Sequence, residues 1–581
     1  MIIFQARTLK NVVAVPAVLA CGLLFISMTP AFAQSAADIG NAARQSEIIQ
    51  QQQMLRQRDD IQRSLKNRRA PTKLSVPAPV VPKGRGEGCR NIKTVEIKGA
   101  THMDDFDHKA LTKGYNGRCL GVNEIQSLMG DITKYYIDKG YATTRVYLPS
   151  QDLTTGKLIV QIVEGRVQDI RMKKGSKGAF LPGAFPNVIG SNLNLRDIEQ
   201  GLDQINRLLS NNASMDIEPG TTAGDSIITI KNDPTKRWHA SFSGDNYGTR
   251  TTGRDQLGVS ASYDDLFGLN EFYSFSKRNT IPYRDRNQQA GSNSYLFSIP
   301  YGYTTLTMGV SESNYNSTLN TAGGVKLQLE GDNRSYFTSL DQVVYRNQDS
   351  KLNLTGTLTQ KSSTNYIASQ KLAVSSRRLT VFDIGLNYST LMGGGSANLG
   401  AGYSKGLKWF NALEDLSALP GSIPHAQFSK LTASAGYMRP FSVVRRDFTF
   451  STQATGQFGL DTLYGSEQMS AGGIYSVRGF YDTTLLNDHG ISVRNDLTLL
   501  QTLATIRGLP VSFRPYVALD GGTVWGRAPK SPSGTLIGAA VGFSMAYGPA
   551  SFDVYTGKPI SAPDDIDKEG FNTFGRFAVT F

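Results

Sequence analysis

The sequence predicts a mainly β protein: a transmembrane β-barrel of about 16 strands, preceded by two small α/β domains and an N-terminal helix. Three observations support this prediction. Glycine (59 residues), phenylalanine (27) and tyrosine (25) are plentiful and charged residues make up only 19%, which suits short strands joined by tight turns. Segments of about ten residues with alternating polar and apolar side chains fill the C-terminal part of the chain. Before them, a pattern of strands and helices occurs twice.

Residues 1–33 are expected to be an export signal. Arg7 and Lys10 precede an apolar run that ends in Ala31-Phe32-Ala33, a small-x-small signature, so we expect cleavage after Ala33. An uncleaved anchor is the alternative, since about 20 apolar residues span a bilayer, but two prolines and the cleavage triplet argue against it. A lipoprotein-type cleavage box at Cys21 is discounted because the apolar run continues past it.

Two cysteines, Cys89 and Cys119, remain after the signal is removed. An even number of cysteines in an exported protein predicts a disulfide. It would close a loop of about 30 residues, worth about 3–4 kcal/mol in the chain-entropy treatment. Two buried free thiols are the alternative, and a metal site would need more ligands than this pair offers.

Residues 34–66 are rich in glutamine and arginine and predict a helix with a thin apolar stripe, made of Ile39, Ala43, Ile49, Ile61 and Leu65. A helix that is polar nearly all round can neither anchor in a core nor lie in a membrane interface. It therefore needs bulk solvent or a water-filled cavity. Residues 67–88 are rich in proline and predict an extended, semi-rigid spacer.

The two α/β domains are predicted at residues 89–165 and 166–234. Each is expected to follow a β-α-α-β-β plan. Its clearest elements lie at 93–98, 123–139, 141–149 and 157–165 in the first domain and at 166–174, 195–209, 214–219 and 225–233 in the second. Small sheets of this kind leave edge strands open.

Residues 235–581 predict the barrel. One strand places Leu257, Val259, Ala261 and Tyr263 on one face, and serine and glycine on the other. Such an opposite face is too polar for a protein core, whereas alternation of apolar and polar residues over about ten positions is typical of a membrane barrel with a wet interior. A soluble β-sandwich would also alternate, but it would not need low-charge, glycine-rich inner faces with aromatic residues at strand ends. The final residues "GRFAVTF" end the chain on an outward-facing aromatic.

The sequence offers no sign of an enzyme or a cofactor. It contains no HExxH or P-loop motif, and its five histidines are scattered. The segment "DDIDKEG" at 564–570 resembles the start of a calcium loop, but the twelfth position holds Arg576 in place of glutamate, so an acidic extracellular loop is expected. The net charge of +13 is spread along the chain without a basic, aromatic module. We therefore predict no catalytic residue, metal, small-molecule substrate or nucleic-acid partner.

Several longer strings carry a resemblance to a known family. They are "GRCLGVNEIQSLMGDITKYYIDKGYATTRVYLPSQDLTTGKLIVQIVEGRV", "SIPYGYTTLTMGVSESNY", "SRRLTVFDIGLNYS", "LYGSEQMSAGGIYSVRGF" and "YVALDGGTVWG". With them, residues 89–581 resemble the outer-membrane transporters of two-partner secretion systems, of the haemolysin-activator type, which place two POTRA domains before a barrel.

The resemblance implies a function and a location. Residues 89–165 and 166–234 would be POTRA domains that face the periplasm and receive an unfolded exported partner, a haemolysin, adhesin or toxin, through their edge strands. The barrel would lie in outer-membrane lipid and translocate the partner to the cell surface, with residues 34–66 as a plug in the pore. A barrel-assembly factor is the alternative function, which the plug-like helix and the proline-rich spacer disfavour. A passive porin would need neither POTRA domains nor an arginine loop.

The resemblance also implies a site in the lumen. In this family, a loop with the motif formed here by Val477, Arg478, Gly479 and Phe480 folds back into the barrel, and its arginine contacts an acidic residue on the inner wall, here Asp520. A carboxylate accepts the planar guanidinium fork bidentately, and Gly479 permits a positive φ. Gly521 and Gly522 are both expected to leave room for the loop.

Overall fold

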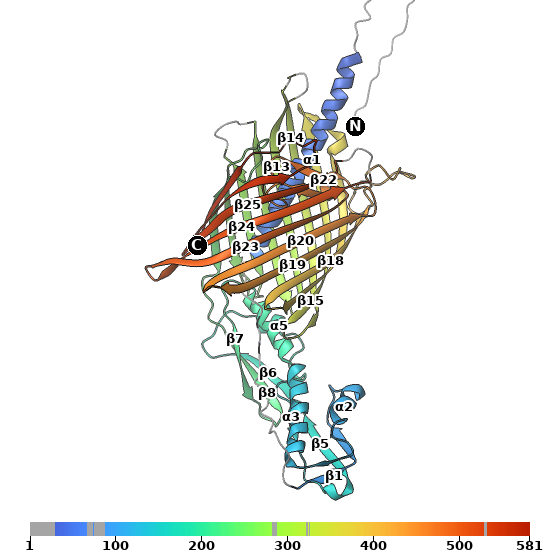
Figure 1. Ribbon diagram of the computed structural model, residues 1–581, viewed down its shortest axis with the longest axis vertical. Coiled ribbons are helices and arrows are strands. Elements are labelled where there is room, and N and C mark those ends of the chain that lie inside the picture. The colour runs from blue at the N-terminus through green and yellow to red at the C-terminus, as the bar shows by residue number, and fades with distance from the viewer. Residues whose placement is uncertain are drawn as a thin grey trace, which may run out of the picture.

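A computed structural model describes residues 29–66, 72, 74, 88–281, 287–320, 324, 326–527, 532–566 and 568–581. The predicted export signal lies outside these residues up to residue 28, and so does most of the predicted spacer at 67–88. The molecule is elongated, with the two α/β domains following one another below the barrel and a helix running through the barrel (Figure 1).

Sixteen strands of the described chain close the barrel, each antiparallel to its neighbours. The predicted number of strands is therefore confirmed. Around the wall they are β9 (Trp238–Asp245), β10 (Gln256–Asp264), β11 (Phe272–Thr280), β12 (Gln289–Tyr301), β13 (Thr304–Asn320), β14 (Lys326–Arg346), β15 (Ser350–Ile367), β17 (Arg377–Met392), β18 (Gly395–Leu407), β19 (Ser429–Val443), β20 (Arg446–Gly459), β23 (His489–Ile506), β24 (Leu509–Trp525), β25 (Gly534–Tyr547), β26 (Ala550–Ser561) and β27 (Asn572–Thr580).

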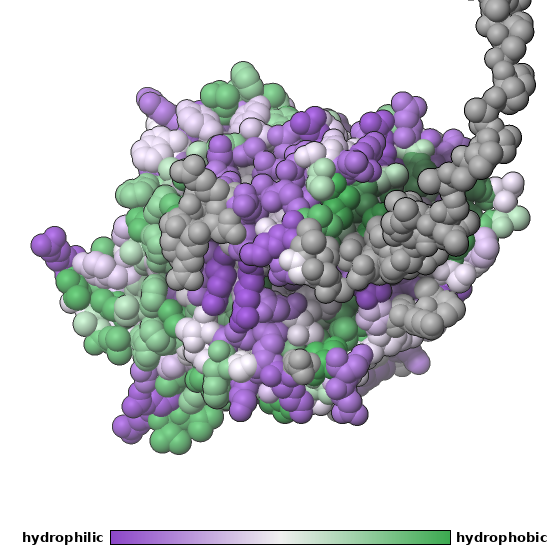
Figure 2. Space-filling view, turned by 90° about the horizontal axis from the view of Figure 1, so that it is seen from above, coloured by the Kyte–Doolittle hydropathy of each residue, from purple (hydrophilic) through white to green (hydrophobic). Residues whose placement is uncertain are grey.

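The connections differ between the two ends of the barrel. Most of those beside the α/β domains are tight turns, such as Gly302-Tyr303 between β12 and β13 and Gly393-Gly394 between β17 and β18. Those at the other end are longer, and one of them holds β16 (Gln370–Lys371) and the 3-10 helix η2 (Ala373–Ser375). Seen from that other end, hydrophilic residues gather over the middle of the molecule (Figure 2). The barrel thus has the short-turn and long-loop ends of a bacterial outer-membrane barrel.

Helix α1 (Thr29–Lys66) runs through the barrel interior (Figure 1). It contacts strands β12 to β15 of the wall. It begins five residues earlier than the predicted helix at 34–66 and ends at the same residue. Within the described part of the chain, no helix is long and apolar enough to cross a bilayer.

The first α/β domain has a three-stranded sheet in the order β2-β5-β4. Its elements are β1 (Arg90–Ile92), β2 (Thr94–Lys98), α2 (Asp105–Thr112), β3 (Arg118–Leu120), α3 (Val122–Asp138), β4 (Arg145–Tyr147), η1 (Leu153–Thr155) and β5 (Lys157–Val163). Helix α3 buries Ile125, Leu128, Ile132 and Tyr136 on one face, as its spacing predicts.

The strand predicted at 141–149 is shortened to β4. Gly140 has a φ of 97°, and the Tyr141 amide donates to the Tyr136 carbonyl at 2.8 Å, which finishes the last turn of α3. The residues before Arg145 therefore belong to the helix end, which a period of two does not reveal.

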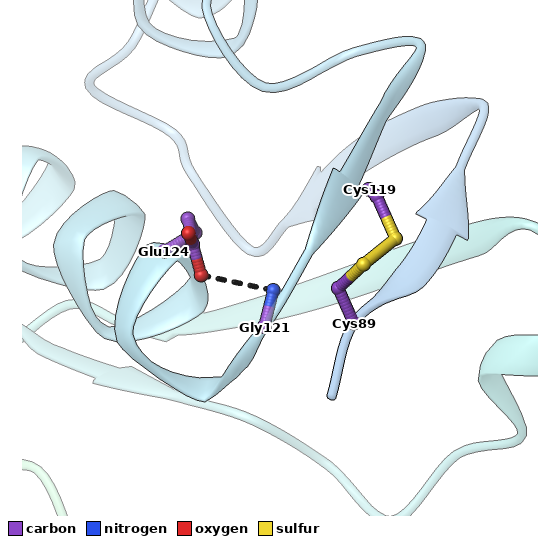
Figure 3. The surroundings of a disulfide bond; sticks show 4 residues. All are labelled: Cys89, Cys119, Gly121 and Glu124. Atoms are coloured by element: carbon purple, nitrogen blue, oxygen red, sulfur yellow. Dashed lines mark hydrogen bonds between the residues drawn. A yellow bond between two sulfur atoms is a disulfide. The ribbon is translucent and has the colours of Figure 1, made fainter. Parts of the chain in front are cut away.

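A disulfide joins Cys89 and Cys119 in this domain, with Cα atoms 5.3 Å apart (Figure 3). It ties the start of the domain to β3, which pairs with β1. Just after Cys119, the Gly121 amide donates to Glu124 Oε2 at 3.0 Å and so begins α3. The disulfide thus fixes the two-stranded ribbon that leads into the main helix.

The second α/β domain repeats the plan with the sheet order β6-β8-β7. Its elements are β6 (Arg166–Met172), α4 (Leu181–Ala184), α5 (Leu195–Asn206), β7 (Ser214–Pro219) and β8 (Asp225–Lys231). Helix α5 buries Ile198, Leu202 and Ile205 against the sheet.

Glu164 holds the two α/β domains together. Its carboxylate accepts hydrogen bonds from the His102 amide at 3.0 Å and the Tyr136 hydroxyl at 2.9 Å in the first domain, and from Asn192 Nδ2 at 2.9 Å in the second. Burial raises the pKa of Glu164, but the hydrogen bonds from Thr101, His102 and Tyr136 outweigh it and lower the pKa to about 2. The joint therefore keeps its charge throughout the neutral range.

Helix α5 also carries the joint between the second domain and the barrel. Gln200 and Gln204 both donate to the Gly302 carbonyl, at 3.1 and 2.8 Å. Arg207 donates to Ser298 Oγ at 2.7 Å and to the Asn270 carbonyl at 2.8 Å. One helix thus contacts two neighbouring turns at the short-turn end, which fixes the second domain directly below the lumen.

Candidate functional site in the barrel lumen

The longest connection, residues 460–488, folds back against the inner wall. It contains η3 (Gly465–Glu467) and a hairpin of β21 (Met469–Gly472) and β22 (Thr484–Asn487). Its apolar residues form a buried cluster with two wall residues; the members are Ala471, Val477, Phe480, Leu485, Val524 and Leu536. Burial of this apolar surface holds the loop on β24 and β25.

Arg478 projects from the loop to Asp520 on β24. Its Nε lies 2.7 Å from Asp520 Oδ2 and its Nη2 lies 2.8 Å from Oδ1, which is a bidentate pair. The Arg478 amide also donates to Asp520 Oδ2 at 3.0 Å, and Nη1 donates to Asp496 Oδ1 on β23 at 2.6 Å. The side chains of Arg478 and Asp520 are 5% and 0% exposed. Removing one member of such a buried pair costs about 3–5 kcal/mol, because the other charge loses its partner.

One glycine of the loop and one of the wall allow this approach. Gly479 has a φ of 108°, and a Cβ there would lie 2.6 Å from the Lys558 carbonyl oxygen on β26. A Cβ on Gly538 of β25 would lie 2.0 Å from the Arg478 carbonyl oxygen. The loop backbone therefore lies directly on the wall, closer than any other residue would permit.

The expectation for Gly521 is wrong. A Cβ on Gly522 would lie 2.9 Å from Val477, but a Cβ on Gly521 would have no heavy atom within 4 Å. Neighbouring residues of a strand point to opposite faces, so Gly522 faces the loop and Gly521 faces outward. Gly538 and Gly557 also leave room for the loop, because the backbone of the motif lies directly against each of them.

Sequence reasoning missed Glu569. This residue lies in the 564–570 segment, which was expected to be an acidic extracellular loop. Its carboxylate accepts hydrogen bonds from the amides of Tyr481, Asp482 and Thr483, the residues that follow the motif, and from Asn572 Nδ2 at 2.9 Å. A contact between positions so far apart in the chain leaves no local signal in the sequence.

A second ionic cluster holds the beginning of the loop. Glu467, 1% exposed, accepts from Lys361 Nζ on β15 at 2.6 Å and from Lys430 Nζ on β19 at 3.1 Å. Together with Arg478 and Asp520, this cluster fixes the loop to opposite parts of the wall, β15–β19 and β23–β26.

Helix α1 lies in the lumen beside the loop, and many of its contacts are made by polar side chains. Toward the wall, Glu47 pairs with Arg377 at 2.5 Å and Asp60 pairs with Arg278 at 2.9 Å. Toward the loop, the side chain of Gln51 donates to the Gln468 carbonyl at 3.1 Å, that of Gln52 to Thr484 Oγ1 at 3.1 Å, and that of Arg56 to the Tyr475 hydroxyl at 3.2 Å. The helix therefore lies between the wall and the loop, and its polar side chains bind to both.

The apolar stripe predicted for this helix is buried only in part. Ile49 is buried with Ala42 against Tyr315 and Leu329 of the wall and Leu372 of the long connection after β15, and Ala43 packs against this cluster. Ile39 is 41% exposed. The side chain of Leu65 lies outside the described residues.

The chain after α1 is bound at the joint between the second domain and the barrel. The Thr72 amide donates to Asp203 at 2.7 Å and the Leu74 amide to Glu199 at 2.8 Å. The other oxygens of these two carboxylates pair with Arg346 of β14, at 2.7 and 3.3 Å. The segment that leads out of the lumen thus shares its anchors with the domain joint.

Among the described residues, no group of three or more histidine, cysteine, aspartate or glutamate side chains is placed to hold a metal ion. The charged residues described above pair with one another across the lumen.

Comparisons with known proteins agree on one family. The profile of the haemolysin secretion/activation proteins ShlB, FhaC and HecB matches residues 224–545, a POTRA domain of ShlB type matches residues 91–165, and a further POTRA domain matches residues 166–219. The chain is 34% identical over 590 residues to the outer membrane transporter CdiB of Escherichia coli O6:K15:H31 (strain 536), covering 100% of this chain and 96% of that one. It is 28% identical to the hemolysin transporter protein ShlB of Serratia marcescens, covering 87% and 88%.

Solved structures agree as well. The structure of CdiB from Escherichia coli matches with a TM-score of 0.82 and 33% identity, over 92% of this chain and 98% of that one. CdiB from Acinetobacter baumannii, at 21% identity, matches in fold with a TM-score of 0.76, over 93% and 99% of the two chains.

A pair of glycine substitutions tests how the loop is seated. In Gly538→Ala, the new Cβ would meet the Arg478 carbonyl, so we expect the loop to leave the wall and trypsin to cleave the purified protein after Arg478. The matched control is Gly521→Ala, where the Cβ meets open space. Equal resistance of both variants at this bond would contradict the described seat, provided that both barrels keep their heat-modifiable mobility.

Proposed function

The chain belongs to the family of haemolysin secretion/activation proteins ShlB, FhaC and HecB, and from this membership we propose that it secretes its partner protein by moving α1 out of the barrel lumen. It is an outer-membrane transporter of two-partner secretion and not an enzyme. Its partner is a large exported protein, and its POTRA domains face the periplasm. The relatives include the hemolysin transporters ShlB and HpmB.

The observation that supports the movement of α1 is the nature of its contacts. Its bonds to the wall and loop are hydrogen bonds and ion pairs of polar side chains, which water or a passing polar chain can replace. Among its described side chains, only Ala42, Ser46, Ile49 and Gln50 are buried. A plug held in this way can leave without exposing a large apolar surface.

The POTRA domains provide open strand edges for the partner. Strand β7 lies at the edge of the second domain's sheet, and its residues are mostly exposed. An extended chain can add to such an edge through main-chain hydrogen bonds, which need no fixed sequence. Since α5 of this domain lies against the barrel turns, a partner bound at β7 is close to the lumen entrance.

Arg478 has a different part in the proposal from α1. Its bidentate, buried pair with Asp520 keeps the loop on one side of the lumen, so that α1 is the element that moves. The Glu199 and Asp203 anchors keep the departing segment near the periplasmic entrance. A barrel-assembly factor, the alternative, has no need of a polar helix in the lumen or of such an anchor.

Removal of the plug tests its role. Deleting residues 39–66 is expected to raise the conductance or the open probability of the purified protein in planar bilayers, because the polar helix no longer occupies the pore. Arg63→Gln serves as the control, since its salt bridge is with Asp59 of the same helix. Conductance equal to that of the unaltered protein, with a folded barrel, would eliminate the plug assignment.

The ion pair has its own secretion test. Arg478→Ala leaves Asp520 buried without its counter-ion, so we expect secreted partner in the medium to fall at least tenfold while heat-modifiable barrel in the outer membrane stays near normal. Asp520→Ala should give a similar loss, and the double variant little more than either, because the two residues act as one unit. Full secretion by Arg478→Ala would show that transport does not need this ion pair. Losses that multiply in the double variant would show that the two residues act independently.

A further inference from the structure

The outer face of the barrel changes from apolar to polar at one level. Residues two apart on a strand point to the same face, and the register aligns the outward residues Phe275, Tyr295, Val310 and Tyr336 across β11 to β14. One outward position further from the POTRA domains, the register aligns a polar row across β11 to β17: Lys277, Asn293, Glu312, Arg334, Ser362 and Arg378. This level marks the boundary of the apolar membrane belt on the cell-surface side.

Two adjoining hollows lie on this face. The lower one, of about 710 Å³, is lined mainly by apolar residues, among them Trp238, Ala240, Ala261, Tyr263 and Phe297. Ala240 and Ala261 are paired neighbours, so small side chains form the floor between large aromatic ones. The upper hollow, of about 880 Å³, is polar, and Tyr336 lines both. An apolar hollow that continues into a polar one matches the shape of an amphiphile.

The upper hollow carries three cations. Arg334 pairs with Glu312 at 2.7 Å, and Asp332 is the second carboxylate in the lining. Lys277 and Arg378 are exposed on the outer face, and among the described residues neither makes a salt bridge. Free cations beside an apolar belt attract anionic headgroups, and arginine is suited to phosphate in particular.

We propose that this face binds a lipopolysaccharide molecule of the outer leaflet, with its acyl chains in the apolar hollow and one of its two lipid A phosphates beside each of Lys277 and Arg378, which lie at the two ends of the polar row. The polar row lies toward the long-loop end, which is the cell-surface side of an outer-membrane transporter with periplasmic POTRA domains. Lipopolysaccharide fills that leaflet, whereas phospholipids fill the periplasmic one. The site is on the outside of the wall, so it is independent of the lumen contacts on which the secretion proposal rests.

Native mass spectrometry of the purified full-length protein in mild detergent tests this site. The probes are lipid A with two phosphates, the same lipid without phosphates, and phosphatidylglycerol. We expect binding of the bisphosphorylated lipid A to exceed that of the other two by about tenfold or more, as a lost charge-assisted bond predicts. Equal binding of the dephosphorylated lipid or of phosphatidylglycerol would overturn the proposal.

Variants locate the site on the wall. Lys277→Ser/Arg378→Ser should weaken binding of bisphosphorylated lipid A by at least tenfold. The control is Arg439→Ser on β19, whose side chain faces outward like that of Tyr437 two residues before it. Undiminished binding by the double variant would place the lipid elsewhere and overturn the proposal. If the double variant does not give a heat-modifiable barrel, the three probes on the unaltered protein decide.

Discussion

Closure of the barrel wall is the constraint on which the other parts of the molecule depend. Strand β27 pairs with β9 through Arg576–Thr580 and Ser241–Asp245, which joins the last strand to the first. In a bilayer, each strand must find its hydrogen bonds in neighbouring strands, so an opened wall would leave backbone groups unpaired in lipid. A wall that must stay closed leaves the lumen as the place for movement. The contents of the lumen therefore decide what the protein can do.

Two segments lie in the lumen, the 460–488 loop and helix α1, and they are held there by different kinds of contact. The 460–488 loop has an apolar cluster in which Val477 and Phe480 are fully buried, and its Arg478 and Glu467 are ion-paired out of solvent. Helix α1 relies on glutamine hydrogen bonds, each worth about 1 kcal/mol, and on ion pairs whose carboxylates, Glu47 and Asp60, are 26% and 18% exposed. Breaking a buried ion pair costs about 3–5 kcal/mol. The helix is thus the more easily displaced of the two, and the loop behaves as a part of the wall.

The sequence predicts the elements that have a local period, but it does not predict contacts between segments that are far apart in the chain. Alternation in β10 and helical spacing in α3 follow from local periods, which is why the barrel and the α/β plan could be foreseen. The lack of an apolar face on residues 34–66 restricts this helix to bulk solvent or a water-filled cavity, and only the family resemblance selects the lumen. Glu569, Gly538 and the Thr72–Asp203 bond could not, because each depends on a contact between distant segments. Gly521 faces away from the loop because neighbouring residues of a strand point to opposite sides, which the Asp-Gly-Gly string by itself does not reveal.

A cross-link between plug and wall tests the central claim, that α1 must leave the lumen for secretion. The side chain of Gln45 donates to Ser317 Oγ of β13 at 3.3 Å, so Gln45→Cys/Ser317→Cys offers a pair that an oxidant can join. We expect secretion of the partner to stop when the disulfide forms and to return on reduction, whereas each single variant secretes normally under both conditions. Undiminished secretion by the fully cross-linked protein would show that the partner passes with α1 in place, which would contradict the account.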